Sequence, residues 1–225
     1  MSSRSDLTPR PRTYTSPLRD EQAADTRLRI LDAAAQQFAE SGYSGTSLMD
    51  IARAAGASVE TVKLSGPKRE LLLAAFEHSF SGSEGIHSLA KYGPVTEITA
   101  DSDNERYLAR IMHFVGESNK RSSLLWTALV SAAAADTQLR LRLDELQQRR
   151  RADILALVNE LIRRGIASTD IPRETLADTV SFILSPEGYN QLVIEAGWSQ
   201  SRYEAWLRRT VPLIATQRTE ATPTT

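Results

Sequence analysis

The segment from Thr46 to Leu64, TSLMDIARAAGASVETVKL, holds the residues whose types and spacing best suit binding chemistry. Ser58, Thr61 and Lys63 follow a turn that Gly56 permits, and they leave two hydroxyls and an ammonium to face outward. Short hydroxyls can donate to a phosphate or a base edge, and a lysine can reach guanine or phosphate. On one short helix these side chains would form a surface for reading nucleic acid.

Local signals predict that this segment folds as two short helices joined by a tight turn. Ser47 and Asp50 stand at the spacing of a capping box, and Gly56 ends the helix that they open. Ser58 then caps a second helix that runs to about Leu64. In a helix-turn-helix the second helix enters the major groove of DNA. Any two short helices with a glycine turn share part of this pattern, so plain structural packing stays an alternative.

Apolar residues recur at three- and four-residue spacing from Thr26 almost to the end of the chain, which predicts an all-α fold of about nine helices. Neither sustained alternation nor a repeat of fixed period occurs. Residues 81–102 are expected to form a loop, with one short turn of helix within it as the alternative, and Pro186 to interrupt the eighth helix. The pattern predicts a flexible N-terminal arm over 1–25, a three-helix helix-turn-helix domain over 26–70, a larger helical domain over 71–216 and a disordered tail over 217–225. The arm is net basic through residue 19, so a contact with a DNA minor groove is its alternative role.

Composition excludes several classes of protein. The chain has 225 residues, 41% of them hydrophobic, which is enough for a real core. The absence of cysteine excludes disulfides, thiolate metal sites and cysteine nucleophiles, and three histidines without ligand spacing predict no metal site and no cofactor. No apolar run approaches the ~20 residues of a membrane helix, and no secretory signal opens the chain, so we expect a cytoplasmic protein.

The stretch from Arg27 to Phe76 closely resembles the TetR family of transcriptional regulators. The family's signature residues occur here in the family's order, as Phe38-Ala39-Glu40-Ser41-Gly42-Tyr43, Thr46-Ser47, Ile51-Ala52-Arg53-Ala54-Ala55-Gly56-Ala57-Ser58, Thr61-Val62, and Lys68 with Leu71-Leu72. One position is missing after Val62, and the family's tyrosine and phenylalanine there are absent. We therefore expect a recognition helix about one residue short, with Leu64 replacing the lost packing.

The resemblance implies a homodimeric, ligand-responsive regulator, a repressor released from a palindromic operator on double-stranded DNA by a small molecule. Residues 26–70 would be the DNA-binding domain and 71–216 the ligand-binding and dimerisation domain. The alternatives are an all-α enzyme, a scaffold that does not bind DNA, and a degenerate regulator whose short recognition helix reads its operator poorly. No catalytic constellation or phosphate loop stands out in the sequence, so we expect no enzyme.

The candidate DNA contacts follow from the residues and the resemblance together. The resemblance makes Ser47 and Lys68 phosphate contacts, and Thr61 and Lys63 are the candidates for base readout. Thr46 is either a helix cap or a phosphate contact. The full set is Tyr43, Thr46, Ser47, Ser58, Thr61, Lys63 and Lys68.

The seventh predicted helix places Arg150 and Asp153 on its apolar face, three residues apart. A buried charge needs a partner, so the two side chains form an internal pair, the arginine reaches out to water, or both line a ligand cavity and recognise a polar or acidic group. The apolar candidates for the wall of this pocket are Phe80, Met112, Trp126, Phe182 and Tyr189, each with ordinary core packing as its alternative.

The last two long helices carry apolar faces that suit a dimeric four-helix interface of the kind the family forms. Burial within one subunit is the alternative for each of these residues. The candidates are Val180, Leu184, Trp206, Leu207 and Ile214.

Overall fold

The computed structural model describes residues 17–85 and 88–216, and over these residues it contains helices and no strand. The all-α prediction is confirmed. The helices are α1 (Pro17–Gly45), α2 (Leu48–Ala55), α3 (Val59–Leu64), α4 (Lys68–Ser81), α5 (Gly93–Thr99), α6 (Asn104–Ala133), α7 (Thr137–Arg163), α8 (Arg173–Ile183), α9 (Pro186–Tyr189) and α10 (Gln200–Thr216), with a 3-10 turn at Leu89–Lys91 and a π-helical segment at Asn190–Glu195.

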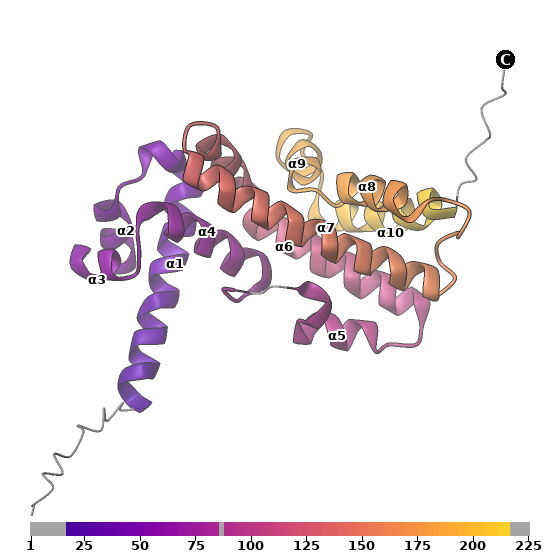
Figure 1. Cartoon of the computed structure of the whole chain (residues 1–225), viewed down its shortest axis with the longest axis horizontal. Helices are drawn as coiled ribbons and strands as arrows, with labels where there is room; N and C mark the ends of the chain where they lie inside the picture. Colours follow the sequence, from indigo (N-terminus) through magenta and orange to yellow (C-terminus); the bar gives the residue numbers. More distant parts are fainter. Residues whose placement is uncertain (1–16, 86–87, 217–225) are drawn as a thin grey trace, which may run out of the picture.

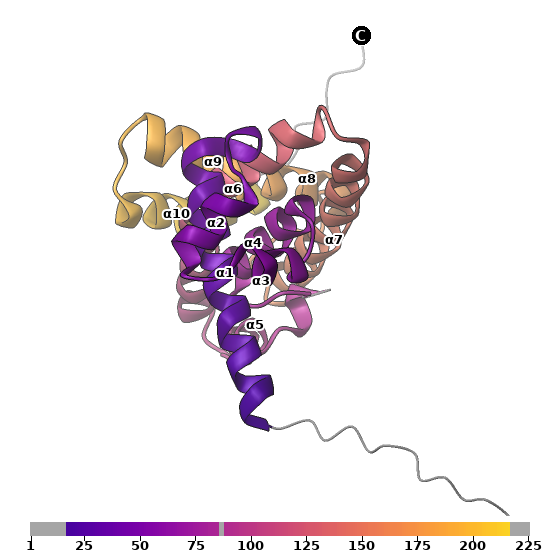
Figure 2. The ribbon, with the colours of Figure 1, turned by 90° about the vertical axis from the view of Figure 1, so that its left-hand side faces the viewer.

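The helices are arranged along the long axis of the molecule (Figure 1). Helices α1–α4, which we call the N-terminal unit, lie at one end, and the long helices α6 and α7 run side by side from it toward α8 and α10. Figure 2 views the molecule from the end formed by the N-terminal unit, with α2 and α3 in front of the longer helices.

The first helix differs from its predicted bounds. It begins at Pro17 rather than at Thr26, so the predicted flexible arm over 1–25 is wrong for residues 17–25, and residues 1–16 lie outside the described part. Proline suits the first turn of a helix because its missing N–H has no intrahelical partner there. The predicted stop at Gly42 is confirmed by its φ of 67° and ψ of 178°, which break the helical path before one further turn.

Two further boundaries were predicted only in part. The expected loop over 81–102 contains α5, which Pro94 opens at the start of the helix. The expected break at Pro186 is confirmed, because α8 ends at Ile183 and Ser185 caps the separate short helix α9 by accepting from the Gly188 N–H at 3.0 Å. The predicted tail over 217–225 lies outside the described residues.

The buried apolar side chains form two clusters, and α6 belongs to both. One cluster joins the N-terminal unit to the last three turns of α6 and the start of α7. The other joins α5, the first half of α6, the end of α7 and α8–α10. Between them, α6 buries four polar side chains, of which none is more than 1% exposed: Ser118, Asn119, Ser122 and Ser123.

Helix α10 crosses α6 closely at Gly116. A Cβ atom at this position would lie 2.9 Å from Glu204 Cγ and 3.1 Å from Gln200 Nε2. Glu204 is itself fixed by hydrogen bonds to His113 at 3.0 Å and to Gln200 at 2.8 Å, so it cannot move aside freely. The absence of a side chain at 116 therefore sets the distance between the two helices.

We expect Gly116→Val to lower the free energy of unfolding by about 1–3 kcal/mol, because the added side chain forces α10 away from α6. Urea unfolding followed by circular dichroism measures the change. Ser131→Val places the same side chain at an exposed position of the same helix and should change stability by less than about 0.5 kcal/mol. Equal losses in the two variants would contradict the packing argument.

Candidate nucleic-acid interface and effector cavity

Helix α2 begins with the capping box that the sequence predicts. The Ser47 hydroxyl accepts from the Asp50 N–H at 3.2 Å, and the Asp50 carboxylate accepts from the Ser47 N–H at 3.1 Å. The hydrogen bonds from Ser47 lower the pKa of Asp50. Gly56 ends the helix with a φ of 61° and a ψ of 36°, in the left-handed region that glycine adopts without strain.

Helix α3 is capped by Ser58, whose hydroxyl accepts from the Thr61 N–H at 3.0 Å. Val62 is buried against Ile51 and Ala52 of α2, which confirms the predicted contact between the two helices. The helix has only six residues, as the missing position predicts. Its outward residues fall into two kinds. Ser58 and Lys63 are exposed, while Thr61 is half-buried and its hydroxyl lies 2.8 Å from that of Ser58.

Thr46 has neither of its predicted roles. The residue is 2% exposed, and its hydroxyl oxygen lies 2.9 Å from the Gln37 carbonyl oxygen and 2.8 Å from that of Gly42. Ser47, not Thr46, is the N-cap of α2. The threonine instead closes the end of α1, where carbonyl groups lack helical partners.

Lys68 is held by the connection between α1 and α2. Its ammonium donates to the Tyr43 carbonyl at 2.8 Å and to the Thr46 carbonyl at 3.0 Å, and it lies 4.2 Å from the centre of the Tyr43 ring. That ring stacks on Phe38 at 6.0 Å, and burial raises the pKa of its hydroxyl. Lys68 and Tyr43 thus hold α4 against the end of α1 through contacts within the N-terminal unit.

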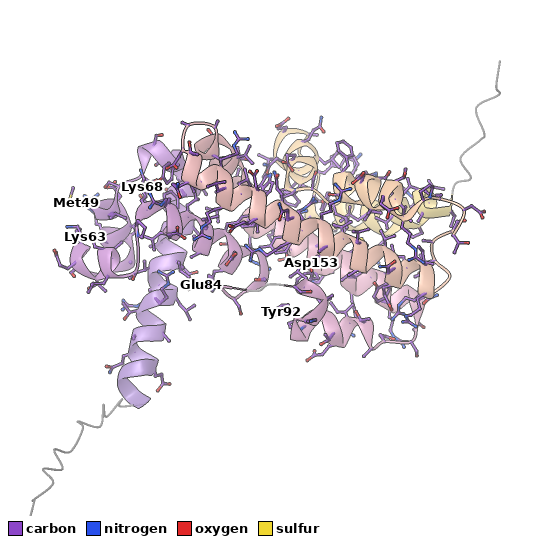
Figure 3. All side chains as sticks on the ribbon, in the orientation of Figure 1. Met49, Lys63, Lys68, Glu84, Tyr92 and Asp153 are labelled. Atoms are coloured by element: carbon purple, nitrogen blue, oxygen red, sulfur yellow. The ribbon has the colours of Figure 1, made fainter. Side chains whose placement is uncertain are left out.

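The expected substitution of Leu64 for the family's packing residue is wrong. Leu64 is the last residue of α3 and is 89% exposed, so it does not fill the place of a buried packing residue. Met49 on α2 is a second exposed apolar side chain of this unit, at 58%, and the sequence did not predict its exposure. In Figure 3, Met49, Lys63 and Lys68 lie at the end formed by the N-terminal unit, far from Tyr92 and Asp153.

A cavity of about 240 Å³ lies between α6 and α7, closed by α5 and by the connection between α8 and α9. Of the predicted pocket residues, Phe80, Arg150 and Asp153 line it. Most of the wall is apolar and comes from one face of α6, from Tyr107 to Asn119, and one face of α7, from Arg150 to Glu160. The other lining residues are Leu89, Ala90, Val95, Thr99, Leu184 and Pro186.

Four predicted pocket residues lie elsewhere. Met112 is fully buried in the second apolar cluster, and Tyr189 packs edge-on against Tyr203 with ring centres 5.0 Å apart. Phe182 is 77% exposed because the last turn of α8 directs it outward. Trp126 lines two neighbouring hollows instead, and its indole N–H donates to Glu187 at 2.5 Å.

Arg150 and Asp153 line the cavity but do not form the internal pair that was one of their predicted roles. The Arg150 guanidinium donates to the Ser181 hydroxyl and, at 2.7 Å, to the Ser181 carbonyl. The Asp153 carboxylate accepts from the Leu89 N–H at 2.9 Å and from the Ser88 hydroxyl at 3.3 Å. Burial lowers the pKa of Arg150 and raises that of Asp153.

The end of α4 forms part of the cavity wall through Phe80, and it is held against α6 and α7 by charged side chains. Arg121 of α6 donates to the Ser79 carbonyl at 2.8 Å and to the Phe80 carbonyl at 3.1 Å. Arg149 of α7 forms an ion pair with Glu77 at 2.7 Å. The helix that opens with Lys68 in the N-terminal unit therefore ends in contact with the cavity.

The structure corrects most of the predicted interface residues. Val180, Leu184 and Leu207 are at most 5% exposed and fill the core of one subunit, so they are not available to a partner. Trp206 and Ile214 are half-buried. The exposed large apolar residues in this region were missed by the sequence analysis, because a helical stripe does not say which element covers it: Phe182, Ile194 and Leu213.

Comparison with known proteins finds similarity to this chain in part of the sequence and in the fold. The model for bacterial regulatory proteins of the tetR family matches residues 30–63, which include α2 and all of α3 except its last residue. A search among curated proteins finds no match. The fatty acid degradation regulator FadR from Bacillus halodurans has the same fold, with a TM-score of 0.65, 17% identity, and coverage of 83% of this chain and 94% of that chain.

Two further solved structures of this fold carry ligands. FadR from Bacillus subtilis, in complex with stearoyl-CoA, has a TM-score of 0.64 and 14% identity, over 82% of this chain and 96% of that chain. A protein from Saccharomonospora viridis, in complex with choline, has a TM-score of 0.62 and 20% identity, over 87% of this chain and 100% of that chain. The predicted resemblance to TetR-family regulators is thus confirmed, by the family model over the helix-turn-helix and by the fold over the described residues.

The described part of the chain lacks membrane-spanning helices and clusters of metal ligands. Within 17–85 and 88–216, no helix combines the length and apolar character that crossing a membrane requires. Within the same ranges, no group of three or more histidine or acidic side chains could hold a metal ion.

We expect Lys68→Met to lower the free energy of unfolding by about 2 kcal/mol, because two carbonyl groups lose a charged donor. Lys63→Met, which removes an exposed lysine of the same unit, should change stability by less than about 0.5 kcal/mol. Thermal and urea unfolding measure both. If the two variants were equally stable, the role of Lys68 in holding the α1–α2 connection would be refuted.

The raised pKa of Asp153 predicts a pH dependence of stability. The folded chain binds this proton at a higher pH than the unfolded chain, whose carboxyl has the ordinary value of 3.8. Between the pKa of the unfolded chain and the higher pKa of the folded chain, the free energy of unfolding falls as the pH rises. Asp153→Asn keeps an oxygen for the Leu89 N–H, so it should remove this slope while preserving the fold. Urea unfolding at several pH values tests this, and an unchanged slope would contradict it.

Proposed function

We propose that the protein is a homodimeric, ligand-responsive transcription regulator, a repressor that a small molecule releases from a palindromic operator. The observation that carries the proposal is the α2–Gly56–α3 arrangement, which leaves Ser58, Thr61 and Lys63 on the outer side of a capped helix. In a helix-turn-helix these positions face the major groove. The match of residues 30–63 to the tetR family model supports the same role.

We assign the candidate DNA contacts according to which side chains are exposed and which are engaged within the protein. We assign Ser58, Thr61 and Lys63 to the groove and Ser47, at the exposed start of α2, to phosphate. Tyr43 and Lys68 act by fixing the α1–α2 connection, with any contact to phosphate secondary to that role. Thr46 takes no part, since it is buried.

A route from ligand to DNA runs through α4. Its first residue, Lys68, holds the helix-turn-helix connection, and Phe80 near its end lines the cavity. A ligand that displaces Phe80 would shift α4 against α6 and α7, to which Glu77 and the last carbonyl groups are tied. Since the two recognition helices of a dimer must lie one DNA turn apart, about 34–36 Å, a small shift of α4 weakens binding.

Dimerisation would use the outer faces of α8 and α10. Phe182 on α8 and Leu213 on α10 are 77% and 56% exposed, and the half-buried Trp206 and Ile214 lie on the same pair of elements. An apolar surface of this kind suits a self-complementary interface. We place the protein in the cytoplasm, where its DNA target is.

A degenerate regulator is the second candidate, because α3 is short and lacks the family's tyrosine and phenylalanine. This candidate has the same cavity and dimer but does not select a DNA sequence. An enzyme has less support, since the titratable residues of the cavity are engaged by neighbouring groups rather than arranged around a nucleophile.

Selection from random double-stranded oligonucleotides should yield a palindrome, bound by two chains. Lys63→Met should weaken binding about tenfold and reduce the slope of log affinity against log salt by about one unit per half-site, because it removes one cationic contact. Lys91→Met, which removes an exposed lysine far from α3, is the control and should leave both unchanged. Fluorescence anisotropy measures affinity, and sedimentation measures stoichiometry.

Failure to enrich any sequence at low salt would favour the degenerate regulator. A chain that sediments as a monomer, free and with DNA, would contradict the dimer.

A further inference from the structure

The cavity extends along α6 and α7, and its two ends differ. Its α6 wall runs from Tyr107 to Asn119, about 18 Å at a rise of 1.5 Å per residue, and its α7 wall from Arg150 to Glu160, about 15 Å. The two helices are antiparallel here. Glu160 lies close enough to Tyr107 to raise the pKa of its hydroxyl, while Asn119 and Arg150 both bind the end of α8. A chain-shaped ligand fits such a space.

Between its ends the cavity is lined by aliphatic and aromatic side chains. Ile111, Phe114 and Val115 face it from α6, and Ile154 and Leu157 face it from α7. They offer no hydrogen-bonding side chain over this length. The body of the ligand is therefore apolar, and its polar group belongs at the α8 end.

Asn119 at the α8 end has an unused acceptor. The residue is fully buried, and its amide nitrogen donates to the Leu184 carbonyl at 3.3 Å and to the Tyr203 hydroxyl at 3.2 Å. Because a carbonyl can only accept, the nitrogen must face Leu184, and this fixes the direction of the amide oxygen. That oxygen has no hydrogen-bond partner among the described residues. A buried acceptor without a donor is costly, so a ligand that brings an N–H or O–H gains there.

Arg150 supplies the complementary donors. Two of its five N–H groups bind Ser181, and no carboxylate of the described residues lies within ion-pair distance of its guanidinium. Asp153, one helical turn along α7, contributes the opposite charge to the same end of the cavity. For a charged head group, attraction to one of these residues is opposed by repulsion from the other: Asp153 repels a carboxylate that Arg150 attracts, and Arg150 repels an ammonium that Asp153 attracts.

Two other charged groups of the described residues lie near this end. Arg149, the cation near Asp153, is paired with Glu77 at 2.7 Å. Glu187, the carboxylate that acts on Arg150 from α9, accepts from the neutral Trp126 indole and keeps its negative charge, so it opposes a carboxylate head group together with Asp153. At the far end, Glu160 is bound by Arg163 and Arg164. The head group that meets these conditions is neutral and both donates and accepts.

We propose that the cavity binds a neutral, elongated amphipathic molecule, an apolar chain whose head group pairs a carbonyl oxygen with an N–H or O–H, as in a fatty amide. The carbonyl accepts from Arg150, and the donor bonds the free oxygen of Asn119. The proposal rests on the ligand-responsive function proposed above and names the class of its ligand.

The test compares four compounds with one ten-carbon chain on the full-length protein: decanamide, methyl decanoate, decanoate and decylammonium. Calorimetric titration at neutral pH should show decanamide binding at least tenfold more tightly than each of the others. Methyl decanoate lacks a donor, decanoate lacks a donor and carries a negative charge, and decylammonium lacks an acceptor and carries a positive charge. This ranking is measured on the unaltered chain, so the test stands even if a variant fails to fold.

Matched variants assign the head-group contacts. Asn119→Leu should reduce the affinity for decanamide to that for methyl decanoate and leave the ester within threefold. Asn190→Leu alters a half-buried asparagine whose amide oxygen is also buried without a partner, outside the cavity, and should preserve the ranking. Arg150→Met should weaken both amide and ester, while Arg151→Met, at the exposed neighbour, should not.

The outcomes separate this proposal from the function on which it rests. Tightest binding by decanoate or decylammonium, equal binding of all four, or binding of none would overturn the neutral-ligand class, and DNA selection would still decide the regulator role independently. Preferred binding of decanamide to a chain that selects no DNA sequence would uphold the ligand class and refute the regulator. Decanamide that binds and also lowers operator affinity would support both.

Discussion

The structure depends on the packing of one thirty-residue helix, α6, into two separate apolar clusters. Its last turns bury Leu125 and Leu129 in the cluster of the N-terminal unit, and its first turns bury Tyr107 and Met112 in the cluster that also holds side chains of α7, α8 and α10. Burial of apolar surface is the main stabilising contribution in both clusters. Since α6 is one continuous helix, a shift of either half also moves the other half and disturbs the cluster in which that half is packed.

The middle of α6 departs from this apolar packing, and the features that suit a ligand lie there. Ser118, Asn119, Ser122 and Ser123 are buried where the two clusters meet, and the polar end of the cavity begins at Asn119. Polar groups weaken a core unless they are bonded. Placed at a boundary between clusters, they leave each cluster intact, and the Ser118 hydroxyl and the Asn119 amide oxygen have no hydrogen-bond partner among the described residues.

Local features of the structure were predictable because their cause lies within a few residues. Ser47 with Asp50, the left-handed Gly56 and the cap at Ser58 depend on neighbouring backbone groups, so the helix-turn-helix could be located to the residue. The short α3 followed from counting positions. The prediction that Leu64 replaces the family's packing residue was wrong. The missing position shows that a packing residue is lost, but it does not show whether another side chain can fill the space.

The sequence by itself determined the all-α fold, the ends of most helices, the helix-turn-helix and the apolar face of α7 with two charges on it. Tertiary structure decided what those charges meet: Arg150 bonds Ser181, 31 residues away, and Asp153 bonds the N–H of Leu89, 64 residues away. It likewise gave Thr46 and Lys68 hydrogen bonds around the end of α1 that the sequence did not predict. The physical reason is that helical periodicity fixes which residues share a face, whereas the partner of that face depends on how separate helices pack.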